Sequence, residues 1–117
     1  WLRIIQTSPF LRKWFSLGLG EDDLLALEIE ILRGPELYPI VKGTGGVRKV
    51  RFARSGAWRG KSRAYRVCYA YFARHGMVFL LTAYGKNEQA NLTKAQQNAI
   101  ARAIRDIEES IEKGEIR

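Results

Sequence analysis

The sequence predicts an α+β fold with the element order β-α-α-β-β-β-α, in which a small, antiparallel-rich sheet packs with two N-terminal helices and a C-terminal helix. Three β-prone runs, at 47–54, 63–73 and 77–84, are joined by short breaks, which is typical of an antiparallel meander. A capping-box sequence, 93–96, then precedes isoleucines at positions 100, 104, 107 and 111. This helical spacing predicts a long amphipathic helix at the C-terminal end.

The segment before the meander supplies the first strand and the two N-terminal helices. Residues 2–6 can form a short strand, and Ser8, followed by a proline, is expected to cap a helix over 10–17. Consecutive acidic residues at 21–23 favour the positive end of a second helix, which is expected to run to Arg33 and to stop at the glycine and proline that follow. Apolar residues at 27, 29 and 31 also alternate as in a strand, but the length of the segment and its acidic start favour the helix.

Length and composition limit the class of protein. The chain has 117 residues, of which 46% are hydrophobic, so it is expected to form a single domain over residues 1–117. Its single cysteine excludes an internal disulfide framework, and its longest apolar run is too short to span a bilayer as a helix. We therefore expect a cytoplasmic protein without a membrane partner. The net charge of +8 favours polyanionic partners, namely nucleic acid, an anionic membrane surface or an acidic protein.

Charge is distributed unevenly along the chain. No acidic residue occurs between Glu36 and Glu88, and the acidic residues cluster instead in the second and the last predicted helix. An ordinary solvated surface mixes both signs, because unopposed like charges repel one another. This separation of signs favours a surface that binds nucleic acid. The basic residues of the interval are Lys42, Arg48, Lys49, Arg51, Arg54, Arg59, Lys61, Arg63, Arg66, Arg74 and Lys86.

Strand periodicity places three of these cations near one another. Lys49 and Arg51 are two residues apart and share one face of their strand, whereas Val50 and Phe52 point to the other face. Arg66 lies among apolar residues of the next strand, where a charge needs a partner. The three cations are therefore expected to bind a phosphate. The alternative is that Arg66 pairs with a carboxylate of a packed helix.

Other potentially reactive residues are expected to be structural. His75 lies in a turn and has no second ligand residue, so no metal site and no cofactor are expected. Cys68 lies within a strand and is expected to be a small buried residue rather than a nucleophile. The glycine-rich segment 43–46 precedes a strand, which does not fit a phosphate-binding loop. Aromatic residues of the second β-prone run can stack on bases, but most are expected to be core residues: Tyr65, Tyr69, Tyr71 and Phe72.

Two motifs resemble those of a known family. Residues 43–72, GTGGVRKVRFARSGAWRGKSRAYRVCYAYF, and residues 78–93, VFLLTAYGKNEQANLT, are similar to the RelE/HigB superfamily of toxins of type II toxin–antitoxin systems, most closely to its HigB-like branch. The resemblance implies a cytoplasmic, metal-independent endoribonuclease that cleaves mRNA, usually on the translating ribosome, and so inhibits translation. It also implies a cognate antitoxin, typically with a helix-turn-helix DNA-binding domain.

The resemblance further implies roles for individual residues in attack by the RNA 2′-hydroxyl on the adjacent phosphate. Lys49 is assigned as the base, because neighbouring cations favour the neutral form of its amine. Arg51 and Arg66 would stabilise the negative charge of the phosphorane, and Lys86 would protonate or neutralise the leaving 5′-oxygen. The expected RNA-binding residues are Arg48, Arg54, Arg59, Lys61, Arg63, Tyr84 and Asn87.

The sequence departs from the best-known RelE pattern where that pattern supplies the general acid. Asn87 stands in place of an arginine, and no tyrosine occurs at or near Thr93. Tyr84 is the nearby residue that can substitute for it.

Two other functions are compatible with the sequence. One is a branch with the same fold that inhibits DNA gyrase without cutting RNA, although that branch generally lacks the cation cluster of Lys49, Arg51 and Arg66. The other is a non-catalytic module that binds nucleic acid, for which the basic interval alone would suffice.

Overall fold

The computed structural model describes residues 2–54 and 64–116, and its helices and strands confirm the predicted order. The segment at 27–31 belongs to a helix, as its length and acidic start had favoured. Within the described ranges, no helix is both long enough and apolar enough to cross a lipid bilayer. The elements are β1 (Arg3–Gln6), α1 (Ser8–Ser16), α2 (Glu21–Leu32), β2 (Arg48–Ala53), β3 (Ala64–Phe72), the 3₁₀ turn η2 (Ala73–His75), β4 (Met77–Gly85) and α3 (Lys94–Glu112).

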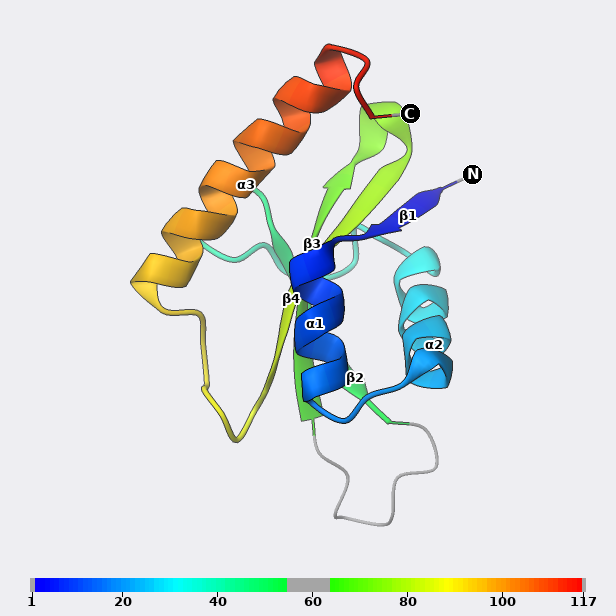
Figure 1. Cartoon of the computed structure of the whole chain (residues 1–117), viewed down its shortest axis with the longest axis vertical. Helices are drawn as coiled ribbons and strands as arrows, with labels where there is room; N and C mark the ends of the chain where they lie inside the picture. Colours follow the sequence, from blue (N-terminus) through cyan, green and yellow to red (C-terminus); the bar gives the residue numbers. More distant parts are fainter. Residues whose placement is uncertain (1, 55–63, 117) are drawn as a thin grey trace.

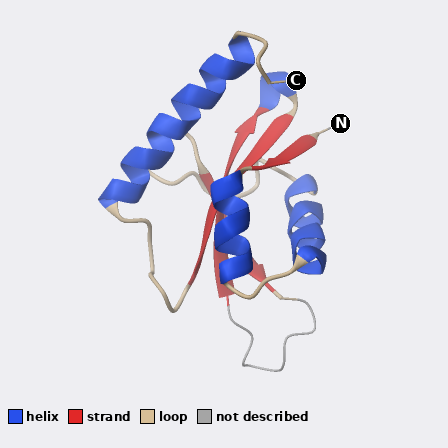
Figure 2. Cartoon of the chain, in the orientation of Figure 1, coloured by secondary structure: helices blue, strands red, loops and turns tan. Residues whose placement is uncertain are grey.

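The four strands form one mixed sheet in the order β1-β4-β3-β2 (Figure 2). β2, β3 and β4 are the predicted antiparallel meander, and β1 joins its edge by pairing with β4 in parallel. The long helix α3 lies on one face of the sheet and the helices α1 and α2 lie on the other, so the molecule has three layers (Figure 1).

Each face of the sheet has its own hydrophobic core. The core between the sheet and helices α1 and α2 centres on Phe10, Trp14, Leu27, Val50, Val67 and Tyr69, all of which are inaccessible to solvent. The core under α3 includes Val47, Cys68, Ala70, Phe79, Ile100 and Ile104. Successive strand residues face opposite cores. Two of the four aromatic residues of β3, Tyr65 and Tyr69, are buried, and Tyr71 and Phe72 are partly buried and pack against the cores.

Local hydrogen bonds determine where the helices begin. Thr7, and not Ser8 as predicted, is the N-cap of α1: its hydroxyl accepts a hydrogen bond from the backbone N–H of Phe10 at 3.3 Å. The same hydroxyl donates to the carbonyl of Leu80 at 2.8 Å, which ties the start of α1 to β4. The predicted capping box of α3 is confirmed by both of its reciprocal hydrogen bonds, at 3.1 and 2.9 Å.

A β-bulge in β4 changes which of its side chains face α3. The pairing of β3 with β4 shifts register between Cys68 and Tyr69, which leaves Leu81 as an extra residue in β4. Simple alternation would place Tyr84 on the same face as Leu80, towards α1 and α2. Because of the bulge, the side chain of Tyr84 lies instead on the α3 face.

Candidate functional site

Two rows of side chains cross strands β2, β3 and β4 on the α3 face of the sheet. In strand order, the rows are Lys49, Cys68 and Thr82, and then Arg51, Arg66 and Tyr84. Residues that face one another across antiparallel strands have Cα atoms about 4.5–5.5 Å apart. The structure therefore brings together the three cations that strand periodicity had grouped.

These rows lie towards the end of the sheet that α3 does not cover. In Figure 1, α3 runs beside the end at which β3 turns into β4, while the opposite ends of these strands extend beyond it. Arg51 is exposed, and Lys49 and Arg66 are half-buried. The cations are thus accessible from solvent above a hydrophobic layer.

Arg66 and Tyr84 share an unusual feature, which is a buried polar atom without a hydrogen-bond partner. The Nη1 atom of Arg66 and the hydroxyl of Tyr84 are both inaccessible, and neither has a partner among the described residues. Arg66 also takes part in none of the ion pairs of the described chain, so the alternative of a carboxylate partner is not found there. Leaving such groups unsatisfied is unfavourable, and a ligand that accepts hydrogen bonds would relieve it.

Burial also keeps two side chains of the rows, Tyr84 and Cys68, in their protonated forms. It raises the pKa of Tyr84 to about 12, an effect that nearby Cys68 reinforces and the charge of Arg66 opposes. At neutral pH the tyrosine hydroxyl is therefore protonated and able to donate. Burial likewise raises the pKa of Cys68 to about 12, against the opposing charge of Lys49, so this thiol is not a thiolate. The prediction that Cys68 is buried is confirmed.

The loop that follows β4 adds a polar group to the first row. The amine of Lys49 donates to the Oδ1 atom of Asn91 at 3.4 Å. Neither Asn91 nor Thr82 was among the predicted site residues. Thr82 reaches this face through the bulge in β4, and Asn91 reaches it through the path of an irregular loop, so no periodic signal in the sequence could have identified them.

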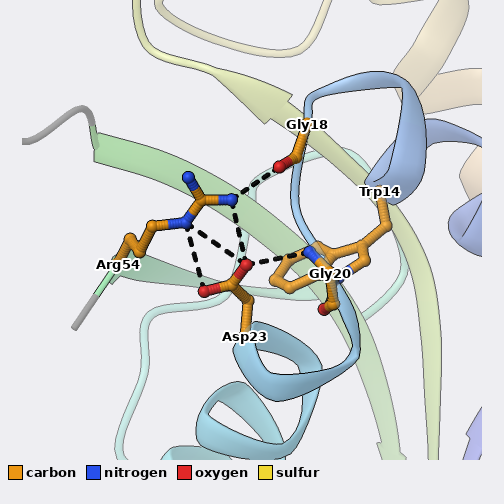
Figure 3. Close-up of polar contacts among 5 residues, drawn as sticks. All are labelled: Trp14, Gly18, Gly20, Asp23 and Arg54. Atoms are coloured by element: carbon orange, nitrogen blue, oxygen red, sulfur yellow. Dashed lines mark hydrogen bonds and ion pairs between the residues drawn. The ribbon is translucent and has the colours of Figure 1, made fainter. Parts of the chain in front are cut away.

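Two of the predicted RNA-binding arginines lie on the opposite face of the sheet and are already engaged. Arg48 pairs across the sheet with Tyr69, and its Nη1 atom donates to the carbonyls of Glu36 at 3.1 Å and Tyr38 at 2.8 Å. Arg54 forms an ion pair with Asp23 at the start of α2, with a closest distance of 3.0 Å (Figure 3). The structure does not bring either residue together with the two rows.

The ion pair of Arg54 and Asp23 predicts a pH dependence of stability. Burial raises the pKa of Asp23, but hydrogen bonds from Arg54 and from the Gly20 backbone outweigh burial and lower it below its usual 3.8. A carboxyl group whose pKa is lowered by folding stabilises the fold above its unfolded pKa, and this contribution is lost as the pH falls through the folded pKa. We expect Asp23→Asn to cost about 1 kcal/mol at pH 7, because the pair is partly screened by solvent, and less at pH 2.5.

Urea unfolding at both pH values measures this difference, with Asp22→Asn as the control because the Asp22 side chain is exposed. An equal loss at both pH values would contradict the assignment.

The remaining predicted residues are separate from the two rows or lie outside the described residues. Lys86 and Asn87 are exposed and line a shallow depression shared with Leu17 and Tyr65, beside the end of α1. Arg59, Lys61 and Arg63 lie outside the described residues. Among the residues that the structure does describe, no group of three or more histidine, cysteine or acidic side chains is arranged to hold a metal ion.

Comparison with known proteins identifies the fold. No protein-family model matches the chain. The structure is similar to that of an arginine-to-alanine double mutant of the E. coli toxin RelE in the free state, with a TM-score of 0.53 and 18% sequence identity. The match covers 76% of this chain and 87% of that one. The predicted RelE-like α+β fold is therefore confirmed, and at this level of sequence identity the likeness shows the fold alone.

Proposed function

We propose that this chain is the toxin of a type II toxin–antitoxin system, of the HigB-like branch, and that it is a metal-independent endoribonuclease acting on mRNA at the translating ribosome. The observation that carries the proposal is the row of Arg51, Arg66 and Tyr84, in which a guanidinium nitrogen and a hydroxyl are buried without partners among the described residues. The sequence motifs and the RelE-like fold support the same conclusion.

The row suits a phosphate because of its charge. Arg51 and Arg66 face one another directly across β2 and β3, and like charges in that arrangement destabilise a sheet. An anion between them turns this repulsion into attraction and accepts hydrogen bonds from both guanidinium groups. The Tyr84 hydroxyl, protonated at neutral pH, can donate to a third oxygen. The pentavalent transition state carries additional negative charge, so it is bound more tightly than the substrate.

In the proposed cleavage, one residue accepts the proton of the attacking hydroxyl and another donates a proton to the leaving oxygen. The Lys49 amine removes the proton of the 2′-hydroxyl, and the resulting oxygen attacks phosphorus. The bond from phosphorus to the 5′-oxygen breaks, leaving a 2′,3′-cyclic phosphate on one fragment and a 5′-hydroxyl on the other. Tyr84 lies in the row of the two arginines, so we assign it as the donor of a proton to the leaving oxygen. Lys86, in the exposed loop, remains in the proposal as a cation that neutralises charge on the departing strand.

The proposal includes the partners that the resemblance implied. The basic surface would bind mRNA on the ribosome in the cytoplasm, and a cognate antitoxin with a helix-turn-helix domain would hold the toxin inactive. Exposed apolar side chains on the two N-terminal helices support the need for such a protein partner, since exposed apolar residues can mark interaction sites. They are Phe15 on α1 and Leu25, Ile29 and Leu32 on α2.

Mapping new 5′ ends in mRNA tests this function. Translating ribosomes incubated with the protein are expected to yield fragments with 5′-hydroxyl ends, and Arg51→Ala is expected to abolish them. Arg74→Ala is the matched control, because Arg74 is also an exposed arginine of the basic interval but lies in η2 at the far end of the strands. Retained RNA binding without new ends would indicate a non-catalytic module. Inhibition of DNA supercoiling by gyrase without new ends would indicate the other branch of the fold.

A further inference from the structure

A hollow of about 350 Å³ opens beside Lys49, next to the two rows. Its walls come from three parts of the chain: the segment that leads into β2, β2 itself, and the loop and first turn of α3. The polar side chains around it are two lysines, Lys42 and Lys49, and two amides, Asn91 and Gln97. Pro39, Ile40, Val41 and Leu92 line the remainder, so the hollow combines an apolar surface with cations and amides, and none of these lining residues is acidic.

The segment that forms one wall is held by a network of hydrogen bonds. The Lys49 N–H donates to the Pro39 carbonyl at 3.0 Å, and the Val41 N–H donates to the Val47 carbonyl at 2.7 Å. The fully buried Thr44 hydroxyl donates to the Val41 carbonyl at 2.6 Å and accepts from the Val47 N–H at 3.1 Å. This wall is therefore already formed before any ligand binds.

A glycine permits one of the amides to lie against this wall. Gly43 has a φ of +82°, and a Cβ atom at this position would lie 3.1 Å from the Oε1 atom of Gln97. The backbone conformation and the close approach both favour glycine. Among the described residues, no hydrogen bond engages the side-chain amide of Gln97, so its donor and its acceptor are both available.

The second amide, that of Asn91, is held in place by hydrogen bonds from Lys49 and Gln89. The Oδ1 atom of Asn91 accepts from Lys49 at 3.4 Å, and the Asn91 backbone carbonyl accepts from the Gln89 side chain at 2.8 Å. Within the described chain, its side-chain NH₂ group therefore remains available to donate. Two amides with available groups, beside an apolar surface, match the donors and acceptors on the edge of a nucleobase and the flat face of its ring.

We propose that this hollow binds a single nucleobase of the RNA, that of the nucleotide whose 2′-hydroxyl attacks, and that Asn91 and Gln97 determine which base is accepted. The inference rests on the proposed function, because it takes Lys49 as the base that removes the proton of the 2′-hydroxyl. Lys49 lines the hollow and also begins the first row, so a nucleotide with its ribose at Lys49 has its base in the hollow. Lys42 would then bind the phosphate on the 5′ side of the same nucleotide.

Binding of uncleavable RNA tests the proposal separately from cleavage. The probes are fluorescent 2′-O-methyl pentanucleotides that are abasic except for one central base, with a wholly abasic pentanucleotide for reference. Fluorescence anisotropy is expected to show the wild-type protein preferring one base by roughly fivefold to a hundredfold over the others, as expected for an amide that pairs with a base edge. Gln97→Ala is expected to reduce the preference severalfold while leaving the affinity for the abasic probe unchanged, and Asn91→Ala is expected to reduce the preference severalfold as well. Asn98→Ala, at the exposed neighbouring position in α3, is the matched control and should keep the preference.

The outcomes separate the hollow from the proposed function. Equal affinity of the wild-type protein for all four bases and the abasic probe would overturn the base-binding site, even if unmodified RNA is cut. An unchanged preference in both amide variants, with normal melting curves, would overturn their assigned role. A clear base preference in a protein that cuts no RNA, with or without ribosomes, would overturn the proposed function and leave the base-binding site in place.

Discussion

Replacing Arg66 by alanine is expected to lower the rate of RNA cleavage by roughly a hundredfold or more while the protein stays folded. The reason is that Arg66 has a buried Nη1 atom without a partner and forms no ion pair within the described chain, which fits its proposed role in binding a phosphate. Removing it leaves no carboxylate of the described chain unpaired. The loss of roughly 3 to 5 kcal/mol that follows from breaking a buried ion pair is therefore not expected. A cleavage assay and a melting curve measure the two effects.

Arg66→Lys is the informative companion variant. It retains the charge but loses the planar group that can bind two phosphate oxygens, so most of the loss in rate is expected to persist. A large fall in melting temperature for Arg66→Ala, with activity recovering once the protein is stabilised, would contradict the catalytic assignment.

Replacing Trp14 by alanine is expected to have the largest effect on stability, a loss of roughly 3 to 5 kcal/mol. Trp14 is completely buried, its ring centroid lies 5.4 Å from that of Phe10 and 5.5 Å from that of Phe52, and its indole N–H donates to the Gly20 carbonyl at 3.0 Å (Figure 3). The substitution thus leaves a cavity between α1 and the sheet and removes a hydrogen bond to the Gly20 carbonyl. Because small domains are stable by only about 5 to 15 kcal/mol, the variant is expected to be marginal.

Chemical denaturation at neutral pH measures this loss. Phe15→Ala serves as the control, since Phe15 is the next residue of α1 but its side chain is 49% exposed. Its effect is expected to stay within about 0.5 kcal/mol. Comparable losses in the two variants would contradict the view that α1 is anchored through Trp14.

The fold was predictable because each element has a local signal of its own. The strands were indicated by β-prone runs between turns, and α3 by a capping box followed by regularly spaced isoleucines. The start of α1 was misassigned to Ser8, because the hydroxyl of Thr7 is fixed by the Leu80 carbonyl, which belongs to a residue distant in the sequence. The parallel pairing of β1 with β4 likewise depends on tertiary contacts that no local pattern encodes.

The candidate site was predictable only where strand alternation is regular. Lys49, Arg51 and Arg66 are grouped by period two alone, and the structure does bring them together. The place of Tyr84 on the same face depends on a bulge, which shifts the period by one residue and carries no clear sequence signal. Arg54 has the same residue type as the site arginines, yet it pairs with Asp23 of α2, because it follows the end of β2 on the side of the sheet that α2 covers.

The parallel pairing of β1 with β4 has a consequence for the order in which the protein matures during its own synthesis. Arg3 lies opposite Met77, so β1 cannot join the sheet until β4 has been translated. The row of Arg51, Arg66 and Tyr84 likewise draws one residue from each of three successive strands. The basic residues of β2 are therefore synthesised well before the strands pair and bring the cations together. The proposed activity is therefore expected to arise only after β4 has been translated, when the proposed antitoxin, if it is already present, can bind the newly formed surface first.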